Sequence, residues 1–403
     1  MADTDEIVSF PTTDQPGLRH DAVLDDWRRA DPVRKIRLPY GRWCWVVTRY
    51  DDVKTVLDDT ERFSRRAAAN DDAPRRTPTV VQKGSLASMD GADHARLRRL
   101  LSRDLTVRRM EALRPTTQAH VDAALDAIER RGPVVDLVPD FALAIPITVI
   151  AELIGVPVTD QQQFRSWAEG ILSTVVDDIT GRPVSETSIG ALYSYLTELL
   201  AAKRRAPADD LLSALVSARD DRDALSESEM VYLAFTLLGG GYETTAAMIA
   251  KSVVCLLGHP DQLAVLRDRP ELWPNAVDEL LRWLSLGSGT GLPLVALVDV
   301  ELSSTAIRAG EYVITAPAAA NADEARFVEP QRFDVTRTDN PHFGLGHGPH
   351  FCLGANLAKM EMQVTLRSLF GRFGALRLAV PEEDLVWRPS SALWAVAELP
   401  VTW

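Results

Sequence analysis

Gly344-Leu-Gly-His-Gly-Pro-His-Phe-Cys-Leu-Gly354 is the stretch that decides the fold, because it sets a single cysteine among regularly spaced glycines. Glycine at positions 346, 348 and 354 lets the backbone turn tightly with its amides directed inward. The residues that follow, 355–370, have the hydrophobic periodicity of a helix. A thiolate at the start of a helix is stabilised by free N–H groups and by the helix dipole. The stretch therefore predicts a functional thiolate at Cys352; the alternative is a glycine-rich turn that holds an ordinary cysteine.

The composition excludes a general nucleic-acid binder. The 403 residues carry a formal net charge of −13, whereas such a binder needs a basic surface. Apolar residues make up 46% and charged residues 25%, which is typical of a globular protein. The three cysteines, Cys44, Cys255 and Cys352, lie far apart and form no CxxC pair. This sparse count favours a reducing cytoplasm, and Cys44 and Cys255 are interpreted as buried, inert thiols.

No targeting or membrane segment is expected. The N-terminus, MADTDEIVSF, lacks the basic start and the apolar core of a secretory signal. A membrane helix needs about 18 or more consecutive apolar residues. The nearest candidate, Phe141 to Val158, is interrupted by Pro146, Glu152, Gly155 and Pro157. We therefore expect no membrane partner.

The chain combines a long helical part with shorter stretches of strand character. Residues 91–285 are mostly helical, whereas Trp43 to Thr48 and residues 294–316 carry β signals. This predicts a mainly α protein with a smaller β-rich portion, an α+β class. We expect one domain over residues 1–403, in which residues 1–26 are an N-terminal extension that is loosely ordered at its start. Arg65 to Gln82 lacks periodicity and is predicted to be a long loop of the kind that forms lids.

A long buried helix is predicted from Glu227 to Leu257. Ser226 and Glu229 form a capping box before a run that is apolar on nearly all sides. Three consecutive glycines, residues 239–241, interrupt this run, and each costs about 1 kcal/mol relative to alanine in a helix. We therefore expect a close backbone approach or a local kink there. Close helix packing beside a partly exposed glutamate is the simpler alternative.

These two stretches together resemble the cytochrome P450 family. Gly346 to Gly354 matches the cysteine signature F-G-x-G-x-H-x-C-x-G, except that Leu345 stands where phenylalanine is usual. Phe343 is a candidate replacement for that packing beside the sulfur. Gly240-Gly-Tyr-Glu-Thr-Thr245 resembles the family's (A/G)-G-x-(D/E)-T-T segment. The resemblance covers roughly Trp27 to Trp403 and has the style of actinomycete enzymes of secondary metabolism.

The resemblance implies the cytochrome P450 fold, with one haem b between the long helix and the cysteine loop. Cys352 is then the iron ligand, and a thiolate ligand favours cleavage of the O–O bond. Gly354 belongs to the loop that surrounds the cofactor. Glu243 and Thr244 are implied to relay protons to the oxygen that is being reduced, because this cleavage takes two protons in a site that otherwise excludes water.

A structural network is implied by an E-x-x-R motif. Glu279 and Arg282 lie three residues apart on one helix face, between the long helix and the cysteine loop. The usual third member is an arginine in a P-x-R-F segment, and Pro330-Gln-Arg-Phe333 supplies Arg332. We expect these three side chains to support folding around the haem rather than chemistry.

His94, Arg98 and His350 are implied to bind the haem propionates. His94 and Arg98 belong to a segment, residues 90–98, that resembles D-P-P-x-H-x-x-x-R, and they face one side of a helix. Buried carboxylates need cationic or hydrogen-bonding partners. The alternative for His94 and Arg98 is a solvated basic face.

Leu294 is the second departure from the family pattern. These proteins usually carry an arginine there, in an R-x-A segment that also binds a propionate, whereas this stretch is Gly291-Leu-Pro-Leu-Val-Ala296. We expect Leu294 to present an apolar surface to the substrate cavity. The other pocket candidates, each of which could equally be core, are Leu237, Leu238, Gly241, Leu292, Val295, Leu393 and Trp394.

The implied function is that of a monooxygenase, which uses O2 and a redox partner to oxidise a small-molecule substrate. The resemblance implies hydroxylation or epoxidation, and the apolar pocket candidates favour a bulky apolar or aromatic natural product as the substrate. One alternative is oxidative C–C or C–N coupling of an aromatic or indole-containing, peptide-derived substrate without oxygen insertion. Another is a non-catalytic haem protein that binds or senses a ligand, which would not need Glu243 and Thr244.

Five arginines concentrate positive charge in an otherwise acidic chain. In the family this region borders the face of the haem on which an acidic ferredoxin docks, so a ferredoxin-type partner is implied. A solvated helix face is the alternative. The arginines are Arg96, Arg99, Arg103, Arg108 and Arg109.

Overall fold

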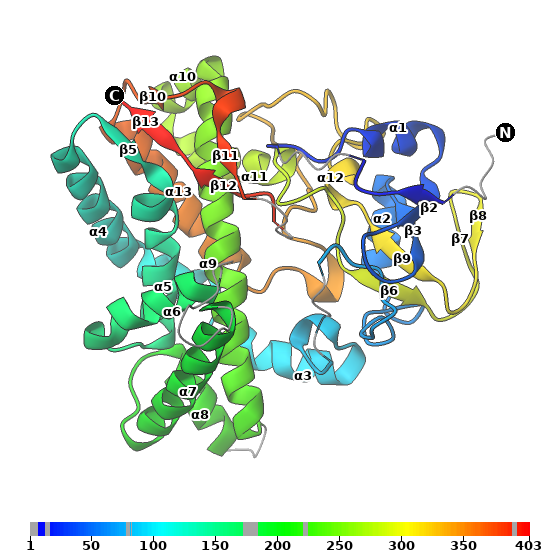
Figure 1. Cartoon of the computed structure of the whole chain (residues 1–403), viewed down its shortest axis with the longest axis horizontal. Coiled ribbons are helices and arrows are strands. Elements are labelled where there is room, and N and C mark those ends of the chain that lie inside the picture. Colours follow the sequence, from blue (N-terminus) through cyan, green and yellow to red (C-terminus); the bar gives the residue numbers. More distant parts are fainter. Residues whose placement is uncertain are drawn as a thin grey trace.

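The computed structural model shows a large helical region beside a smaller region of sheet (Figure 1). It describes residues 7–12, 17–77, 81, 83–171, 184–220, 225–388 and 393–403. Residues 1–6, predicted to be loosely ordered, lie outside this description, as do residues 78–80 and 82 of the predicted long loop. Among the described residues, no helix has the length and apolar character needed to cross a membrane.

Helices dominate the chain, which confirms the prediction of a mainly α protein. The long ones gather on the left in Figure 1, around α9. The helices are α1 (Val23–Ala30), α2 (Tyr50–Asp58), α3 (Gly91–Ser102), α4 (Val107–Arg131), α5 (Ala144–Ile154), α6 (Gln161–Ile171), α7 (Val184–Arg205), α8 (Leu211–Asp220), α9 (Glu227–Gly258), α10 (Pro260–Asp268), α11 (Trp273–Trp283), α12 (Pro317–Ala320) and α13 (Ala355–Arg372), with short turns at η1 (Leu86–Ser88), η2 (Val138–Ala142), η3 (Val158–Asp160), η4 (Pro270–Leu272), η5 (Gly348–His350) and η6 (Glu382–Asp384).

The predicted long helix is α9, and its capping box is formed as expected. The Glu229 amide donates to Ser226 Oγ at 3.1 Å, and the Ser226 amide donates to Glu229 Oε2 at 2.7 Å. The helix continues through its three glycines without a break. A Cβ on Gly241 would lie 3.3 Å from Ile150 Cδ1 of α5, whereas one on Gly239 or Gly240 would meet no atom within 4 Å. Close packing therefore explains Gly241 alone.

The sheet region lies on the right in Figure 1 and contains the strands predicted at residues 43–48 and 294–316. Its main sheet has the order β1-β2-β3-β9-β6-β4, with β3 and β9 parallel. The strands are β1 (Val8–Ser9), β2 (Val33–Arg37), β3 (Trp43–Val47), β4 (Phe63–Ser64), β5 (Val134–Asp136), β6 (Pro293–Ala296), β7 (Val300–Leu302), β8 (Thr305–Ile307), β9 (Tyr312–Thr315), β10 (Arg377–Leu378), β11 (Val386–Trp387), β12 (Val396–Glu398) and β13 (Pro400–Thr402).

The main sheet is covered on both faces, as alternate residues of β3 show. Cys44 and Val46 pack in one apolar cluster, and Trp45 and Val47 pack in another. Complete burial raises the pKa of the Cys44 thiol well above its usual value. Cys44 is therefore the buried, inert thiol that the sequence predicts.

A buried carboxylate on α11 connects this helix with the segment that precedes the cysteine loop. Glu279 is fully buried, and Arg282 donates to its two oxygens, each at 2.7 Å. Arg337 Nε donates to Glu279 Oε2 at 3.1 Å, and Asn340 Nδ2 donates to the same oxygen at 3.2 Å. Buried carboxylates require such partners, because an unpaired charge in the interior is strongly destabilising.

The prediction that Arg332 is the third member of this network is wrong. Its exposed side chain contacts Glu329 at 3.3 Å, and it reaches the network only through its backbone carbonyl, which accepts from Arg282 Nη2 at 3.3 Å. Arg337, five residues later, makes the ion pair with Glu279. The chain between α12 and the cysteine loop is irregular, so spacing alone did not distinguish the two arginines.

Arg282 also links α11 to the cysteine loop, through Asn321. Arg282 Nη1 donates to the Asn321 carbonyl at 2.8 Å, and Asn321 Oδ1 accepts from the Phe343 amide at 2.7 Å. Gly344 follows, and a Cβ there would lie only 2.1 Å from the Leu281 carbonyl oxygen. The start of the cysteine loop thus lies directly against the backbone of α11.

Arg337→Ala should lower the free energy of unfolding by roughly 1.5–3 kcal/mol, the contribution of hydrogen bonds to a charged group. Arg332→Ala, the matched control, should change it by about 0.5 kcal/mol or less, as is usual for exposed side chains. Urea unfolding midpoints of the two variants measure this difference. Equal shifts, or a larger shift for Arg332→Ala, would contradict the assignment.

Candidate active site

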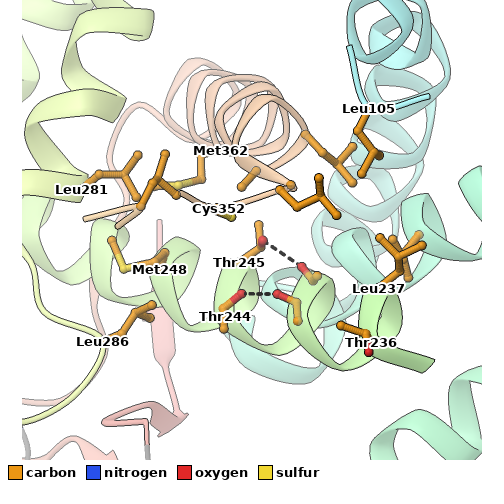
Figure 2. A pocket seen from close by; sticks show the side chains of 18 of the residues that line it. Leu105, Thr236, Leu237, Thr244, Thr245, Met248, Leu281, Leu286, Cys352 and Met362 are labelled. Atoms are coloured by element: carbon orange, nitrogen blue, oxygen red, sulfur yellow. Dashed lines mark hydrogen bonds between the residues drawn. The ribbon is translucent and has the colours of Figure 1, made fainter. Parts of the chain in front are cut away.

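An apolar cavity of about 190 Å³ lies between α9 and the loop that carries Cys352 (Figure 2). Leu237, Thr244 and Thr245 line it from α9, and Leu345 and Cys352 line it from the opposite side. Residues more than one hundred positions apart in the sequence therefore face one another across this cavity. Among the predicted site residues, Leu237, Gly241, Thr244, Cys352 and Gly354 all line it.

The cysteine loop takes its shape from two glycines with left-handed backbone angles. Gly346 has a φ of 77° and Gly348 a φ of 66°, a region that residues with a Cβ rarely adopt. A Cβ on Gly348 would also lie 2.4 Å from the Leu57 carbonyl oxygen of α2. The Cys352 amide donates to the Leu345 carbonyl at 2.8 Å and closes the loop.

The Cys352 thiol is mostly enclosed, and burial raises its pKa above the usual value. The Gly354 amide and the nearby charge of Arg98 act in the opposite direction and lower this pKa. The stabilisation of the Cys352 thiolate that the sequence predicts at the start of α13 is therefore present. In the protein without a cofactor, the effect of burial on this pKa is larger. A buried thiol of this kind loses its proton readily only when a partner that supplies positive charge, such as a metal ion, binds the sulfur and stabilises the thiolate.

Phe343 does not replace the missing phenylalanine beside the sulfur. Its ring packs on Tyr50 with 4.5 Å between centroids and on His347 with 5.5 Å between centroids. Leu345 itself lines the cavity next to Cys352. The sulfur therefore has an aliphatic neighbour at this position.

His94 and His350 meet at one side of the cysteine loop. Their ring centroids are 4.1 Å apart, and the Nε2 atom of each is buried without a hydrogen bond to any described residue. Burial lowers the pKa of His94 to about 4, and it also lowers that of His350. Two neutral imidazoles with unpaired nitrogen atoms fit the predicted contact with an added hydrogen-bonding group.

Arg98 makes a contact within the protein that the sequence does not predict. Its Nη2 donates to the Phe351 carbonyl at 2.5 Å, immediately before Cys352. This bond connects α3 to the cysteine loop. Arg98 therefore positions the loop whatever further partner its remaining N–H groups bind.

Thr244 and Thr245 face Cys352 across the cavity in Figure 2. Thr244 Oγ1 donates to the Gly240 carbonyl at 2.8 Å, and Thr245 Oγ1 donates to the Gly241 carbonyl at 2.8 Å. A hydroxyl that donates a hydrogen bond to a carbonyl still has lone pairs that can accept a second hydrogen bond. Thr245 was not among the predicted site residues, although its place beside Thr244 in the motif could have indicated it.

Glu243, the other residue of the predicted proton relay, does not line the cavity that holds Thr244. It lines a separate small cavity together with Arg388, whose Nη1 lies 3.4 Å from Glu243 Oε1. Burial raises the pKa of Glu243, and the charge of Arg388 partly offsets this rise. Successive helix residues point about 100° apart, so adjacent side chains do not share a face. No sequence motif pointed to Arg388.

A second, larger cavity of about 320 Å³ lies on the sheet side. Leu292 and Leu393, both predicted pocket residues, line it, and so do Arg75 and Arg76 of the predicted long loop. Leu286 lines both this cavity and the one that holds Cys352. The two spaces therefore share a wall.

Four other pocket predictions are wrong, because these side chains line neither cavity and are core residues in the described structure. Leu238 is fully buried in the helical core. Leu294 packs in the cluster of Trp45 and Val313, and the sheet pairs it with Val313 of β9. The last two are Val295, which packs on the other face of the sheet, and Trp394, which is buried.

Comparison with known proteins agrees with this geometry. The chain matches the family model of cytochrome P450 over residues 189–389. It is 46% identical to nocardicin C N-oxygenase of Nocardia uniformis subsp. tsuyamanensis and 44% identical to mycinamicin IV hydroxylase/epoxidase of Micromonospora griseorubida, over 98% of each chain in both cases. Its fold is similar to that of the mixed-function P450 MycG, with a TM-score of 0.93 at 43% identity, covering 99% of this chain and 100% of the other. The chain belongs to the cytochrome P450 family.

Proposed function

We propose that this cytochrome P450 monooxygenase hydroxylates or epoxidises a bulky, largely apolar natural product of secondary metabolism. The observation that carries the proposal is the pair of cavities lined mainly by leucine and other apolar side chains, one of which reaches Cys352 and Thr244. The names of the two relatives, which act on nocardicin C and mycinamicin IV, support a natural product as substrate.

The family uses a haem-iron cofactor, and we propose that here it is haem b with Cys352 as the iron ligand. The cavity between α9 and the cysteine loop and the unpaired nitrogen atoms of His94 and His350 fit a flat group that carries carboxylates. When bound, the haem supplies reductive activation of O2, which a thiolate ligand assists. The leucine and methionine side chains of the cavity exclude water from the reacting centre.

Thr244 and Glu243 are the proposed path for protons. The Thr244 hydroxyl lies in the Cys352 cavity, where it can accept a hydrogen bond and pass on a proton. Glu243 stands behind it on α9, and its raised pKa lets it hold a proton closer to neutral pH than an exposed glutamate does. To deliver a proton to the Thr244 hydroxyl, the Glu243 side chain must therefore move away from Arg388 or pass the proton through a water molecule.

The redox partner is proposed to be a ferredoxin that docks near α3 and the start of α4. Arg96 pairs with Glu229, and Arg109 pairs with Asp104 and Asp209, so these two are already neutralised. Arg99, Arg103 and Arg108 are exposed. Their charge beside the Cys352 loop supports the docking of an acidic partner. The three free cysteines favour the reducing cytoplasm as the compartment.

Cys352→Ser should abolish the red-shifted Soret band of the dithionite-reduced carbonyl complex, because this band depends on a thiolate ligand. Cys255→Ala, which changes a buried cysteine of α9, is the control and should keep the band. Absorption spectra of the purified proteins measure it. A band that survives in Cys352→Ser would remove Cys352 from the iron.

Thr244→Ala should divert electrons from product to hydrogen peroxide, so that peroxide formed per NADPH rises several-fold in a reconstituted ferredoxin system. The physical reason is the loss of the hydroxyl that passes protons in the cavity. Thr244→Ser keeps the hydroxyl and should remain close to the unmodified enzyme. Unchanged peroxide yield in Thr244→Ala would instead favour oxidative coupling without oxygen insertion.

Charge reversal by Arg99→Glu and Arg103→Glu together should lower ferredoxin-supported turnover about tenfold at low ionic strength. The difference should shrink as salt rises, because salt screens exposed charges. Arg377→Glu, an exposed arginine on β10, is the control. If turnover stays the same in the double variant, these arginines form only a solvated helix face.

A further inference from the structure

Three buried nitrogen atoms near the cysteine loop have no hydrogen-bond acceptor among the described residues. They are Nε2 of His94 on α3, Nε2 of His350 in the loop, and Nε of Arg65 directly after β4. His350 Nε2 lies 3.9 Å from Asp90 Oδ1, which is beyond hydrogen-bond distance. Burial lowers the pKa of both imidazoles, and the nearby charge of Arg65 lowers each of them further. Buried polar groups are nearly always paired in native proteins, so three unpaired donors or acceptors in one place indicate a group that binds there.

Arg65 is unusual among these groups because it is a cation without a carboxylate at hydrogen-bond distance in the described structure. The nearest acid, Asp90, is already used: its oxygens accept from Ser64 Oγ at 2.5 Å and from the amides of Arg65 at 3.2 Å and Arg66 at 3.0 Å. Burial lowers the pKa of the Arg65 guanidinium to about 10, so it remains charged at neutral pH. The charge of Asp90 acts on Arg65 and partly offsets this effect of burial. Among the described residues no carboxylate oxygen accepts a hydrogen bond from the Arg65 guanidinium, so the guanidinium can still bind an added carboxylate.

The sheet places Arg65 beside Leu294. β4 and β6 are antiparallel, with Phe63 opposite Ala296 and Ser64 opposite Val295. Continuing this register by one residue sets Arg65 opposite Leu294, and side chains directly opposite in such a pair lie on the same face. Leu294 is apolar and packs into the core of the sheet region. Any guanidinium at this point of the sheet therefore comes from Arg65, on the neighbouring strand.

We propose that Arg65 binds a carboxylate of the haem, beside His94 and His350, and takes the part that the family usually gives to an arginine at the position of Leu294. The inference rests on the haem cofactor of the proposed function. A guanidinium matches a carboxylate with two parallel N–H···O bonds, which a histidine does not offer. The three groups converge from β4, α3 and the cysteine loop, so this contact joins the sheet region to the haem.

Haem loss from the holoenzyme to excess apomyoglobin tests the proposal. Arg65→Leu should accelerate haem loss about tenfold to hundredfold, the effect of losing a hydrogen bond between charged groups. Arg66→Leu is the matched control, because Arg66 is exposed and pairs with Asp93, and it should change the rate less than twofold. Arg65→Leu combined with Leu294→Arg returns a guanidinium from the adjacent strand and should restore the rate to within about threefold.

A second measurement separates a direct contact from a general loss of stability. Each protein is reconstituted with haem and with haem dimethyl ester, whose carboxylates are blocked. In the unmodified enzyme the ester should dissociate much faster than haem, and in Arg65→Leu this ratio should fall about tenfold. An unchanged ratio, or haem loss from Arg65→Leu at the unmodified rate, would overturn the proposal. The carbonyl spectrum of the same samples reports the Cys352–iron bond, so it distinguishes this failure from a failure of the haem-thiolate function.

Discussion

The buried carboxylate of Glu279 is the constraint on which the active site depends. Once it leaves water it must be paired, and Arg282, Arg337 and Asn340 surround it. Arg282 in turn donates to the carbonyl of Asn321, whose side chain accepts from the amide of Phe343, the residue directly before the cysteine loop. The value of such a pair lies in specifying one arrangement more than in net stability, because burying both charges is itself costly. The position of Cys352 relative to α11 is set by this chain of contacts.

The active site also requires a continuous helix opposite the cysteine, and α9 provides it. Its capping box and its burial on nearly all sides keep the helix continuous through three glycines. Thr244 of α9 and Cys352 of the cysteine loop therefore face one cavity (Figure 2). In the proposed holoenzyme the haem lies between them, and the proposed substrate space lies beyond Leu286, on the side of the sheet. Arg65 would connect the sheet to the same cofactor.

Local patterns predicted most of the fold and the two segments that line the candidate site, because a capping box, a helical period and a glycine-rich loop act over a few residues. The errors concern direction and long-range partners. The sequence predicts Glu243 and Thr244 as one proton relay and Leu237 and Leu238 as pocket residues. Neighbouring helix residues point to different sides, so only Thr244 and Leu237 of these pairs line the Cys352 cavity. Leu294 was expected in the cavity, but its direction is decided by its pairing with Val313, more than a dozen residues away. Arg337 and Arg65 carried no motif, and only the folded chain shows what they approach.

In the proposed holoenzyme one haem lies between α9 and the cysteine loop, with its iron bound to Cys352 and its carboxylates beside the two histidines. A crystal structure of the haem-loaded enzyme is the decisive test of this arrangement. We expect Cys352 Sγ as the axial ligand, Thr244 on the opposite face of the haem, and a carboxylate at the unpaired nitrogen atoms of His94 and His350. A histidine bound to the iron, or both haem carboxylates directed away from these two residues, would contradict it.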